Sequence, residues 1–360
     1  MSLKINTNLV EHSKISSFDP NHIVFGRVFT DHMFSCDYVN NEWKNLRIEP
    51  FGKITMSPTL SALHYGQAIF EGMKAFKNSD GVVTLFRPLD NLKRLNHSAE
   101  RMCMPTLPEE IFMTALKKLV SLDKDWIPSQ PGSSLYLRPF MFATDDYLGV
   151  KPSDNYSFMI YACPVSSYYS HPLKVRIEEH YTRASKGGVG AAKCAGNYAA
   201  SMYPTRLAQK DGFDQVLWTD GEHHKYLEET GTSNVFVITD DAVYTPELND
   251  SLLAGITRDS IIQLLRSSGR NVIETKVSVD DLVKWHGEGK VKEMFVTGTA
   301  ATVTNIQLFN YLGKNYEVNH TNDLVSTELM NSLSAIRTLV IPDKFNWVVT
   351  VNESETISNV

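Results

Sequence analysis

Short strand-like stretches and helical segments follow one another along this chain without a regular spacing. Apolar residues recur at helical intervals over residues 89–102 and 255–268, whereas the apolar runs at 134–142 and 157–165 are typical of strands. A doubly wound parallel sheet requires strands and helices that alternate evenly. The irregular order therefore predicts an α+β fold rather than a doubly wound sheet.

Two local signals refine this expectation. Thr106 and Glu109 have the spacing of a capping box, with Pro108 in the first turn, and predict that a helix begins there. The Ser- and Tyr-rich stretch 164–172 has proline at both ends and is the best candidate for a domain connection. For 360 residues we expect two domains, at 1–163 and 173–360.

Composition and charge argue against several classes of function. The net charge of −6 and the pI near 6.0 give no electrostatic footprint for nucleic acid or an anionic membrane. The four cysteines form no C-x-x-C pair and no zinc spacing with the 11 histidines, so we expect a reducing compartment and no metal. Residues 1–18 have no secretion or transit signal, and the apolar runs are too short to span a membrane. These features predict a cytoplasmic protein.

One lysine, Lys193, stands in a segment of small residues. Residues 187–198 read G-G-V-G-A-A-K-C-A-G-N-Y, and no carboxylate lies within ten residues of the lysine in either direction. Small neighbours let the backbone approach a flat, bulky group, and a lysine that is partly dehydrated can attack a carbonyl as a neutral amine. Either Lys193 forms a Schiff base with an aldehyde cofactor, or it is a solvated lysine in a flexible Gly/Ala loop.

Three further clusters could hold a cofactor that carries a phosphate. In 227–234, L-E-E-T-G-T-S-N, an acid could keep a pyridinium nitrogen protonated, or it could end an ordinary strand. In 252–260, L-L-A-G-I-T-R-D-S, the N–H groups of a helix N-terminus suit an anion, although simple helix capping gives the same pattern. In 295–301, F-V-T-G-T-A-A, a turn of small residues could bind phosphate or carboxylate, or be a plain turn.

Three arginines could supply the positive charge that such a site needs. They are Arg87 in L-F-R-P, Arg138 in Y-L-R-P-F and Arg183 before the glycines. Arginine makes bidentate contacts to phosphate and carboxylate, although each of the three could equally be a surface charge. The glycine-rich segment matches neither the P-loop spacing nor the Rossmann pattern.

Taken in order, the motifs resemble those of branched-chain amino acid aminotransferases. They are F-E-G-M-K-A-F, L-F-R-P, Y-L-R-P, G-G-V-G-x-x-K-x-x-G-N-Y, E-x-G-T-x-N and T-G-T-A, and the resemblance extends over about residues 25–340. It implies a two-domain α+β enzyme of fold type IV, similar to D-amino acid aminotransferase and belonging to the class IV aminotransferases. The expected cofactor is pyridoxal 5′-phosphate, with a smaller N-terminal α/β domain and a larger C-terminal domain that contains a pseudo-barrel.

The resemblance implies roles for individual residues. Lys193 would hold the cofactor covalently and move the proton, Glu229 would pair with the pyridine nitrogen, and Tyr198 would hydrogen-bond the ring hydroxyl. The implied phosphate contacts are Arg87, Ile256, Thr257 and Thr299, with support from Arg183. The implied contacts to substrate carboxylates are Tyr65, Tyr136 and Arg138. The implied walls of the side-chain pocket are Phe29, Phe70 and Tyr168, together with Val150 from the partner subunit, and Thr232 and Ala300 would flank the substrate.

The implied reaction is transamination between L-leucine, L-isoleucine or L-valine and 2-oxoglutarate, in a homodimer whose sites share residues across the interface. Ala301 and Thr304 occupy the positions of a C-x-x-C redox switch found in some members, so that regulation is expected to be absent. D-amino acid aminotransferases and aminodeoxychorismate lyases share the lysine and phosphate clusters, but F-E-G-M-K-A-F and the extended N-terminal region suit the branched-chain group better. A non-catalytic sensor of amino acids or pyridoxal phosphate is the alternative from another class, and it would not need both Lys193 and Glu229.

Overall fold

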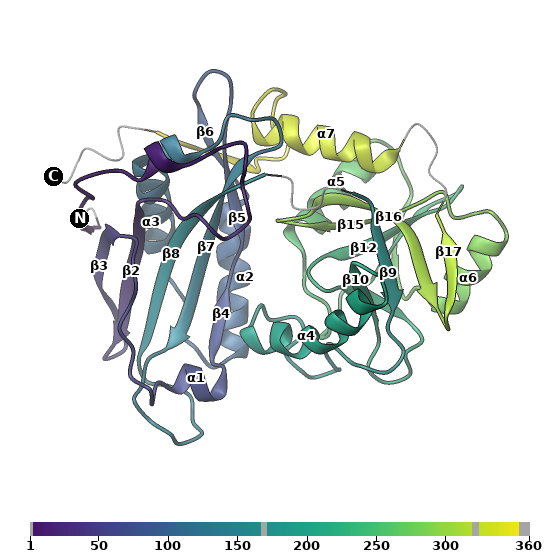
Figure 1. Cartoon of the computed structure of the whole chain (residues 1–360), viewed down its shortest axis with the longest axis horizontal. Coiled ribbons are helices and arrows are strands. Elements are labelled where there is room, and N and C mark those ends of the chain that lie inside the picture. Colours follow the sequence, from purple (N-terminus) through teal and green to yellow (C-terminus); the bar gives the residue numbers. More distant parts are fainter. Residues whose placement is uncertain (1–2, 167–170, 319–323, 353–360) are drawn as a thin grey trace. The chain divides into compact units, whose positions relative to one another are not determined.

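A computed structural model describes residues 3–166, 171–318 and 324–352. The chain divides into two compact units (Figure 1). Unit 1 consists of Met1–Tyr168, Ala192–Ala195 and Ser334–Val360, and unit 2 of Tyr169–Ala191 and Gly196–Leu333. The domain connection expected at 164–172 includes residues 167–170, which lie outside the described residues, so its boundaries stay a prediction.

Unit 1 is built on a mixed sheet in which two long strands, β7 and β8, occupy the middle. The strand order is β1-β3-β2-β8-β7-β5-β6-β18, and β4 also pairs with β7. All the pairs are antiparallel except β1 with β3. The bounds are β1 Asn6–Thr7, β2 His32–Val39, β3 Glu42–Pro50, β4 Ala68–Phe70, β5 Met73–Lys77, β6 Val83–Phe86, β7 Ser134–Ala143, β8 Tyr156–Val165 and β18 Val348–Val351.

Helices α2 and α3 pack on each other and on this sheet. The helices of unit 1 are α1 Ser61–Tyr65, α2 Pro88–Arg101 and α3 Glu109–Leu122, with the short 3-10 turns Ile15–Ser17 and Lys124–Trp126. α3 lies against β2 and β18, and α2 lies against β4. The apolar residues that gave 89–102 its helical spacing include Leu92, Leu95 and Ala99, all of which are buried in α2. The periodicity therefore predicted both the helix and its packed face.

The predicted capping box is wrong. Pro108 is the N-cap of α3, with an extended backbone, and no side chain caps the helix. Thr106 lies outside the helix, and its carbonyl oxygen accepts a hydrogen bond from the indole of Trp43. A proline N-cap leaves the first N–H groups of α3 to other acceptors or to solvent, and Glu109 and Glu110 complement the helix dipole in the first turn.

Unit 2 contains a closed barrel. Six strands follow one another in the order β11-β10-β9-β16-β15-β12, and β11 also pairs with β12, which closes the ring within the described residues. β13 and β14 extend the sheet beyond β12, and β17 pairs with β16. The bounds are β9 Leu173–Ile177, β10 Gln215–Thr219, β11 Leu227–Thr230, β12 Asn234–Ile238, β13 Val243–Pro246, β14 Val272–Thr275, β15 Glu293–Gly298, β16 Thr302–Tyr311 and β17 Lys314–Glu317.

Apolar side chains of the barrel strands form a continuous core. Val175, Val235, Val237, Met294 and Ile306 belong to it, each no more than 1% exposed. The helices are α4 Ala195–Lys210, α5 Ile256–Ser267, α6 Val279–Gly287 and α7 Val325–Arg337. The predicted α+β class and the barrel in the C-terminal part are therefore confirmed. Among the described residues, no helix is long and apolar enough to cross a membrane.

Candidate active site

Lys193 is held by its backbone against the β4 strand of unit 1. The Phe70 amide donates to the Lys193 carbonyl oxygen at 3.0 Å, and Cys194 forms an isolated bridge with Ile69. The Lys193 amide donates in turn to the Ser98 hydroxyl of α2 at 2.9 Å. These contacts fix the backbone on either side of the lysine, while its ammonium lies 4.7 Å from the centre of the Phe70 ring. The bridge between Cys194 and Ile69 therefore fixes the backbone next to Lys193, although the segment before it is rich in glycine.

Phe70 also brings Lys193 close to a predicted carboxylate-binding group. The Arg138 guanidinium lies over the same ring, 4.6 Å from its centre, and donates to the Tyr136 hydroxyl at 3.0 Å. Tyr136 is 6% exposed, and its hydroxyl would lie 2.1 Å from a Cβ atom added at Gly72. The glycine of F-E-G-M is therefore required by the close approach of this tyrosine. Lys193, Phe70, Tyr136 and Arg138 form one cluster.

Arg87 occupies a strained position at the start of α2. Its φ of 52° lies in the left-handed region, and its amide donates to the Trp347 carbonyl oxygen at 2.7 Å. The Arg87 side chain is only 10% exposed, pairs with Asp90 at 2.7 Å and lies 5.4 Å from the Trp347 ring centre. A backbone bond, an ion pair and a ring contact thus hold this arginine in one place.

Among the other predicted substrate residues, Phe29 packs beside the Tyr136 cluster, whereas Tyr65 and Val150 are exposed. Phe29 stacks on Phe51 with ring centres 4.6 Å apart and packs against the cluster that contains Tyr136. Tyr65 is 42% exposed and its hydroxyl donates to the Leu148 carbonyl oxygen, so its contacts are with the 147–150 loop. Val150 is 87% exposed, and its predicted role in a partner subunit stays a prediction. Tyr168 lies outside the described residues.

Glu229 is the centre of a buried polar network in unit 2. It is 5% exposed, and its Oε1 lies 3.0 Å from a terminal nitrogen of Arg183, which is 8% exposed. Its Oε2 accepts from the Asn234 side chain and from the Leu253 amide, both at 3.2 Å. A cation and two hydrogen-bond donors around a buried carboxyl favour its ionised form. Arg183 therefore supports the predicted cofactor acid directly.

Asn234 connects this acid to the start of α5. Its amide nitrogen donates both to Glu229 and to the Leu253 carbonyl oxygen, the latter at 3.0 Å. Gly255, the N-cap of α5, is extended and has no side-chain cap. A Cβ atom at Gly255 would lie 2.0 Å from the Asn234 side-chain oxygen, so only glycine fits there. Ile256 and the buried Thr257 then form the first turn, at the positive end of the helix dipole.

The T-G-T-A turn lies beside the same network. Asn234 is opposite Thr297 in the β12–β15 pair, and a Cβ atom at Gly298 would lie 3.2 Å from the Thr232 carbonyl oxygen. Thr299 and Ala300 follow in the turn between β15 and β16. Unit 2 therefore brings together Glu229, Thr232, Ile256, Thr257, Thr299 and Ala300. Tyr198 lies in α4, where its carbonyl oxygen accepts from Ser201.

Two charged groups were missed by sequence reasoning. Glu71 is fully buried and forms a bidentate ion pair with Arg94 of α2, at 2.7 and 2.8 Å. Glu228 is 3% exposed, and burial raises its pKa to about 7. The sequence did offer a signal for Glu228, namely two consecutive glutamates in a segment that could end a strand. Neighbouring residues of a strand point to opposite faces. Only one of two adjacent acids can then serve one site.

Comparison with known proteins identifies the family. The model of the family described as Amino-transferase class IV matches residues 68–309. The chain is 46% identical over 340 residues to the Branched-chain-amino-acid transaminase 1 of Bacillus subtilis (strain 168). The matched region covers 92% of this chain and 95% of that protein. The chain belongs to the branched-chain aminotransferases. Within this class IV aminotransferase family, the Mycolicibacterium smegmatis branched-chain-amino-acid aminotransferase is 40% identical over 338 residues, or 91% of this chain and 92% of that protein.

Solved structures of branched-chain aminotransferases share the fold. The T.th. enzyme, complexed with N-(5′-phosphopyridoxyl)-L-glutamate, is 26% identical with a TM-score of 0.71 over 88% of this chain and 98% of that one. The enzyme of Thermoproteus uzoniensis reaches a TM-score of 0.73 at 20% identity, over 89% of this chain and 100% of that one. The resemblance seen in the motifs and the fold type IV assignment are therefore confirmed.

Class IV aminotransferases use pyridoxal 5′-phosphate, and the residues of this chain fit that cofactor. A buried carboxylate held by Arg183 suits the protonated ring nitrogen. Asn234 fixes that carboxylate next to a helix N-terminus, which suits the phosphate. Lys193 supplies the primary amine that the aldehyde requires. The cofactor expected from the sequence is thus that of the family, while the role of each residue stays a prediction.

Proposed function

We propose that this chain transfers the amino group of L-leucine, L-isoleucine or L-valine to 2-oxoglutarate, giving the branched-chain 2-oxo acid and L-glutamate. The observation that carries the proposal is the Glu229–Asn234–α5 network, which presents a buried acid and an anion-binding helix end in one unit. The names of the curated relatives support the branched-chain substrates. The glutamate adduct bound by the T.th. enzyme supports glutamate as the other amino acid.

The bound cofactor supplies an aldehyde and an electron-withdrawing ring. Lys193 would hold the cofactor through its ε-amine, and the same amine would move the proton of the substrate Cα. Glu229, which pairs with Arg183, would hold the proton on the ring nitrogen, and Tyr198 would hydrogen-bond the ring hydroxyl. We assign the phosphate to Arg87, Ile256, Thr257 and Thr299.

The substrate pocket must accept both an aliphatic side chain and a second carboxylate. Phe29, Phe70 and Tyr168 would form the apolar wall together with Val150 of the partner subunit, and a methylene-sized group there would contribute roughly 1–3 kcal/mol of discrimination. Tyr65, Tyr136 and Arg138 receive carboxylates, while Thr232 and Ala300 flank the substrate. The stacking of Arg138 on Phe70 supports this division, because one ring contacts both a cation and the apolar wall. The T.th. enzyme was also solved with 4-methylvaleric acid, a carboxylic acid whose remaining part is an apolar hydrocarbon chain.

We further propose a cytoplasmic homodimer with domains at 1–163 and 173–360, except that Ala192–Ala195 and Ser334–Val360 belong to the first unit. The exposure of Val150 together with Tyr147 and Leu148 supports a subunit interface at this loop, since exposed apolar clusters mark interaction surfaces. Light scattering during size-exclusion chromatography tests the dimer, and a monomeric mass for the active enzyme would refute it.

The decisive experiment replaces Lys193 by alanine. We expect transamination and the absorbance of the covalent lysine–cofactor linkage to be lost, because no amine remains at that position. Lys210→Ala, at the exposed end of α4, is the matched control and should retain both. Borohydride reduction and peptide mapping of the parent protein should place the adduct on Lys193. Retained absorbance with full turnover, or an adduct elsewhere, would reject the proposal, and a substrate panel with L-leucine, D-alanine and aminodeoxychorismate separates the related activities.

A further inference from the structure

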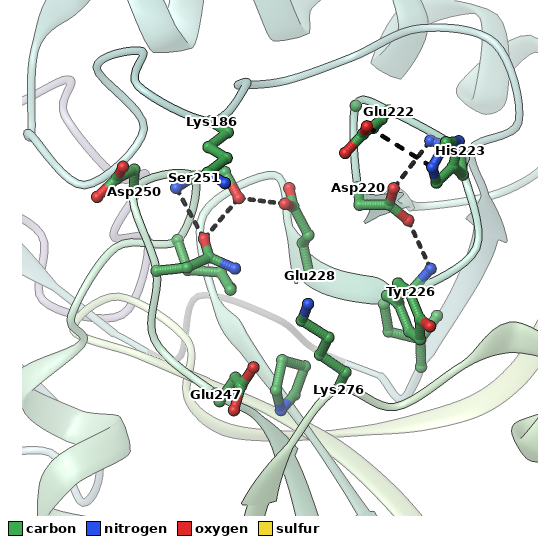
Figure 2. Close-up of a pocket in the computed structure, with 15 residues that line it drawn as sticks. Lys186, Asp220, Glu222, His223, Tyr226, Glu228, Glu247, Asp250, Ser251 and Lys276 are labelled. Carbon is green, nitrogen blue, oxygen red and sulfur yellow. Dashed lines mark hydrogen bonds and ion pairs between the residues drawn. The ribbon is translucent and has the colours of Figure 1, made fainter.

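Unit 2 contains a second pocket that none of the predicted cofactor or substrate residues lines. Its volume is about 540 Å³, within the range of small-molecule sites (Figure 2). It opens between the β10–β11 turn, the segment before α5 and the end of β14. The lining residues with charged or hydroxyl side chains are Lys186, Asp220, Glu222, His223, Tyr226, Glu228, Glu247, Asp250, Ser251 and Lys276.

Glu228 gives this pocket a buried carboxyl group with an unused acceptor. The residue is 3% exposed, and its Oε2 has no hydrogen-bond partner within the described parts of the chain. Figure 2 shows the carboxyl group beside Ser251 at the centre of the lining residues. Leaving a buried carboxylate oxygen unpaired is unfavourable, so a donor from a ligand would satisfy it. Strand alternation directs Glu228 away from the face that Glu229 occupies.

The hydroxyl of Ser251 cannot satisfy every acceptor around it. It contacts Oε1 of Glu228 and lies 2.7 Å from the Asn249 side-chain oxygen, yet a hydroxyl has a single proton to donate. The Ser251 hydroxyl donates to Oε1 of Glu228, and the Ser251 amide donates to the Asn249 side-chain oxygen at 2.8 Å. Both of these acceptors are therefore satisfied when Glu228 is ionised, and its Oε2 is the oxygen left without a donor in the described parts of the chain. The bond from Ser251 therefore stabilises the carboxylate at Oε1 and leaves Oε2 for a donor from a ligand.

The charge of the lining favours a cationic ligand. Carboxylates outnumber lysines five to two, and the Asp220 carboxylate is already occupied by the amides of His223, Lys225 and Tyr226. Within the described residues, no group of three His, Cys, Asp or Glu side chains could hold a metal ion. The cation that suits this pocket is therefore an organic one, large enough to fill a cavity of this size.

We propose that this pocket binds a small organic amine, with its primary ammonium on Oε2 of Glu228. The ammonium donates a charge-assisted hydrogen bond to the ionised carboxylate, and the proton of Glu228 leaves to solvent. A zwitterion would in addition place its carboxylate on Lys276, whose ammonium lies 5.5 Å from the Tyr226 ring centre. None of the lining residues belongs to the predicted catalytic or cofactor-binding set, although Arg183, which pairs with Glu229, also donates to the Ser251 carbonyl oxygen.

Binding of this kind depends on pH. The pKa of Glu228 is raised to about 7 by burial and by Glu229 and Asp220, against the opposing effects of the Ser251 hydrogen bond and Arg183. The other charged groups that line the pocket are Lys186, Lys276, His223, Glu222, Glu247 and Asp250. Because the ammonium needs the ionised acid, affinity should fall about tenfold for each pH unit below 7 and level off above it.

The test is titration calorimetry on the pyridoxamine 5′-phosphate form of the enzyme, whose cofactor has no aldehyde for an added amine. The probes are cadaverine, δ-aminovalerate and the uncharged isostere pentanediol. We expect an amine to bind and Glu228→Gln to weaken that binding by about ten- to hundredfold, since a bond between charged groups is lost. Tighter binding of cadaverine identifies a pure cation, and tighter binding of δ-aminovalerate identifies a zwitterion.

Glu222→Gln is the matched control, because it removes the same charge from the exposed rim of the pocket, where the side chain is 79% exposed. It should change the affinity little. Thermal unfolding and the cofactor spectrum show that both variants are folded. The proposal is overturned if neither amine binds, if pentanediol binds as tightly as the amines, or if the two variants weaken binding equally.

Discussion

At the scale of single residues, the buried pair of Glu71 and Arg94 joins the F-E-G-M motif to α2. Glu71 is completely buried, so removing either partner leaves an uncompensated charge inside unit 1. We expect Arg94→Met to lower the free energy of unfolding by about 3–5 kcal/mol. Denaturant unfolding measures the change. Glu328→Ala, which breaks the exposed pair with Arg270, should change stability by less than about 1 kcal/mol. Similar effects of the two variants would show that burial does not decide the strength of these pairs.

Arg138 allows the proposed substrate assignment to be tested at one side chain. Arg138→Met keeps most of the volume over Phe70 but removes the guanidinium and its bond to Tyr136. We expect kcat/KM for glutamate and 2-oxoglutarate to fall at least about tenfold more than kcat/KM for leucine, because only the former carry a second carboxylate. Arg47→Met, an arginine of the β3 strand paired with Asp37, is the control. Equal losses for all substrates would place the second carboxylate elsewhere.

At the scale of elements, the start of α5 depends on the absence of a side chain at Gly255. In Gly255→Ala the new methyl group meets the Asn234 side chain, so the amide that ties Glu229 to Leu253 must move. We expect a loss of about 1–3 kcal/mol in stability and weaker cofactor retention. Absorbance after dialysis measures the latter.

Gly287→Ala provides the comparison for that variant. Gly287 ends α6, and no described atom lies within 4 Å of an added Cβ. Alanine there should stabilise the protein by about 0.4–1 kcal/mol, because it restricts the unfolded chain without a clash. Cofactor loss in both variants would show that the Asn234 contact is not the cause.

The sequence predicted elements whose pattern is local and missed those that depend on distant pairing. The helices α2 and α5 follow from apolar spacing within 89–102 and 255–268. The closure of the barrel depends on the pairing of β11 with β12 as well as with β10, and neither strand carries that information alone. The start of α3 was placed too early, because the Thr106 pattern ignores the extended backbone of Pro108. The strands β17 and β18 and the helix α7 were not predicted.

The same distinction holds for the candidate site. The motifs indicated Lys193 and Glu229, but they gave no sign that Phe70 would contact both Lys193 and Arg138. Nor did they show that Asn234, at the start of β12, contacts a motif that follows β13 in the chain. Chemistry-bearing residues are visible in a sequence because their types are unusual, whereas their spatial partners follow only from tertiary packing.

At the scale of the whole molecule, the free energy of unfolding should depend on pH through two buried groups, Glu228 and Lys74. Their contributions change in opposite directions as the pH rises. The folded-state pKa of Glu228 is raised from 4.5 to about 7, so its contribution to stability is complete below pH 4.5 and is lost as the pH rises through 7. Burial lowers the pKa of Lys74 to about 7, so its contribution is present above pH 10.5 and is lost as the pH falls towards 7.

Glu228→Gln separates these two contributions. Gln does not titrate, so the stability of the parent protein relative to the variant should decrease by up to about 3 kcal/mol between pH 4.5 and 8, while the Lys74 contribution cancels in the difference. Denaturant unfolding at a series of pH values gives this difference curve. A curve that is flat or rises with pH would mean that Glu228 is ionised in the folded protein.

The link made by Asn234 has a consequence for ligand size. Because one amide sets the spacing between the buried acid and the first turn of α5, the two ends of any molecule held there must match a fixed length. An analogue whose phosphate is one methylene further from its ring can engage the acid or the helix, but not both. The protein would then discriminate by molecular length, even though each end of the longer compound carries the correct chemical group.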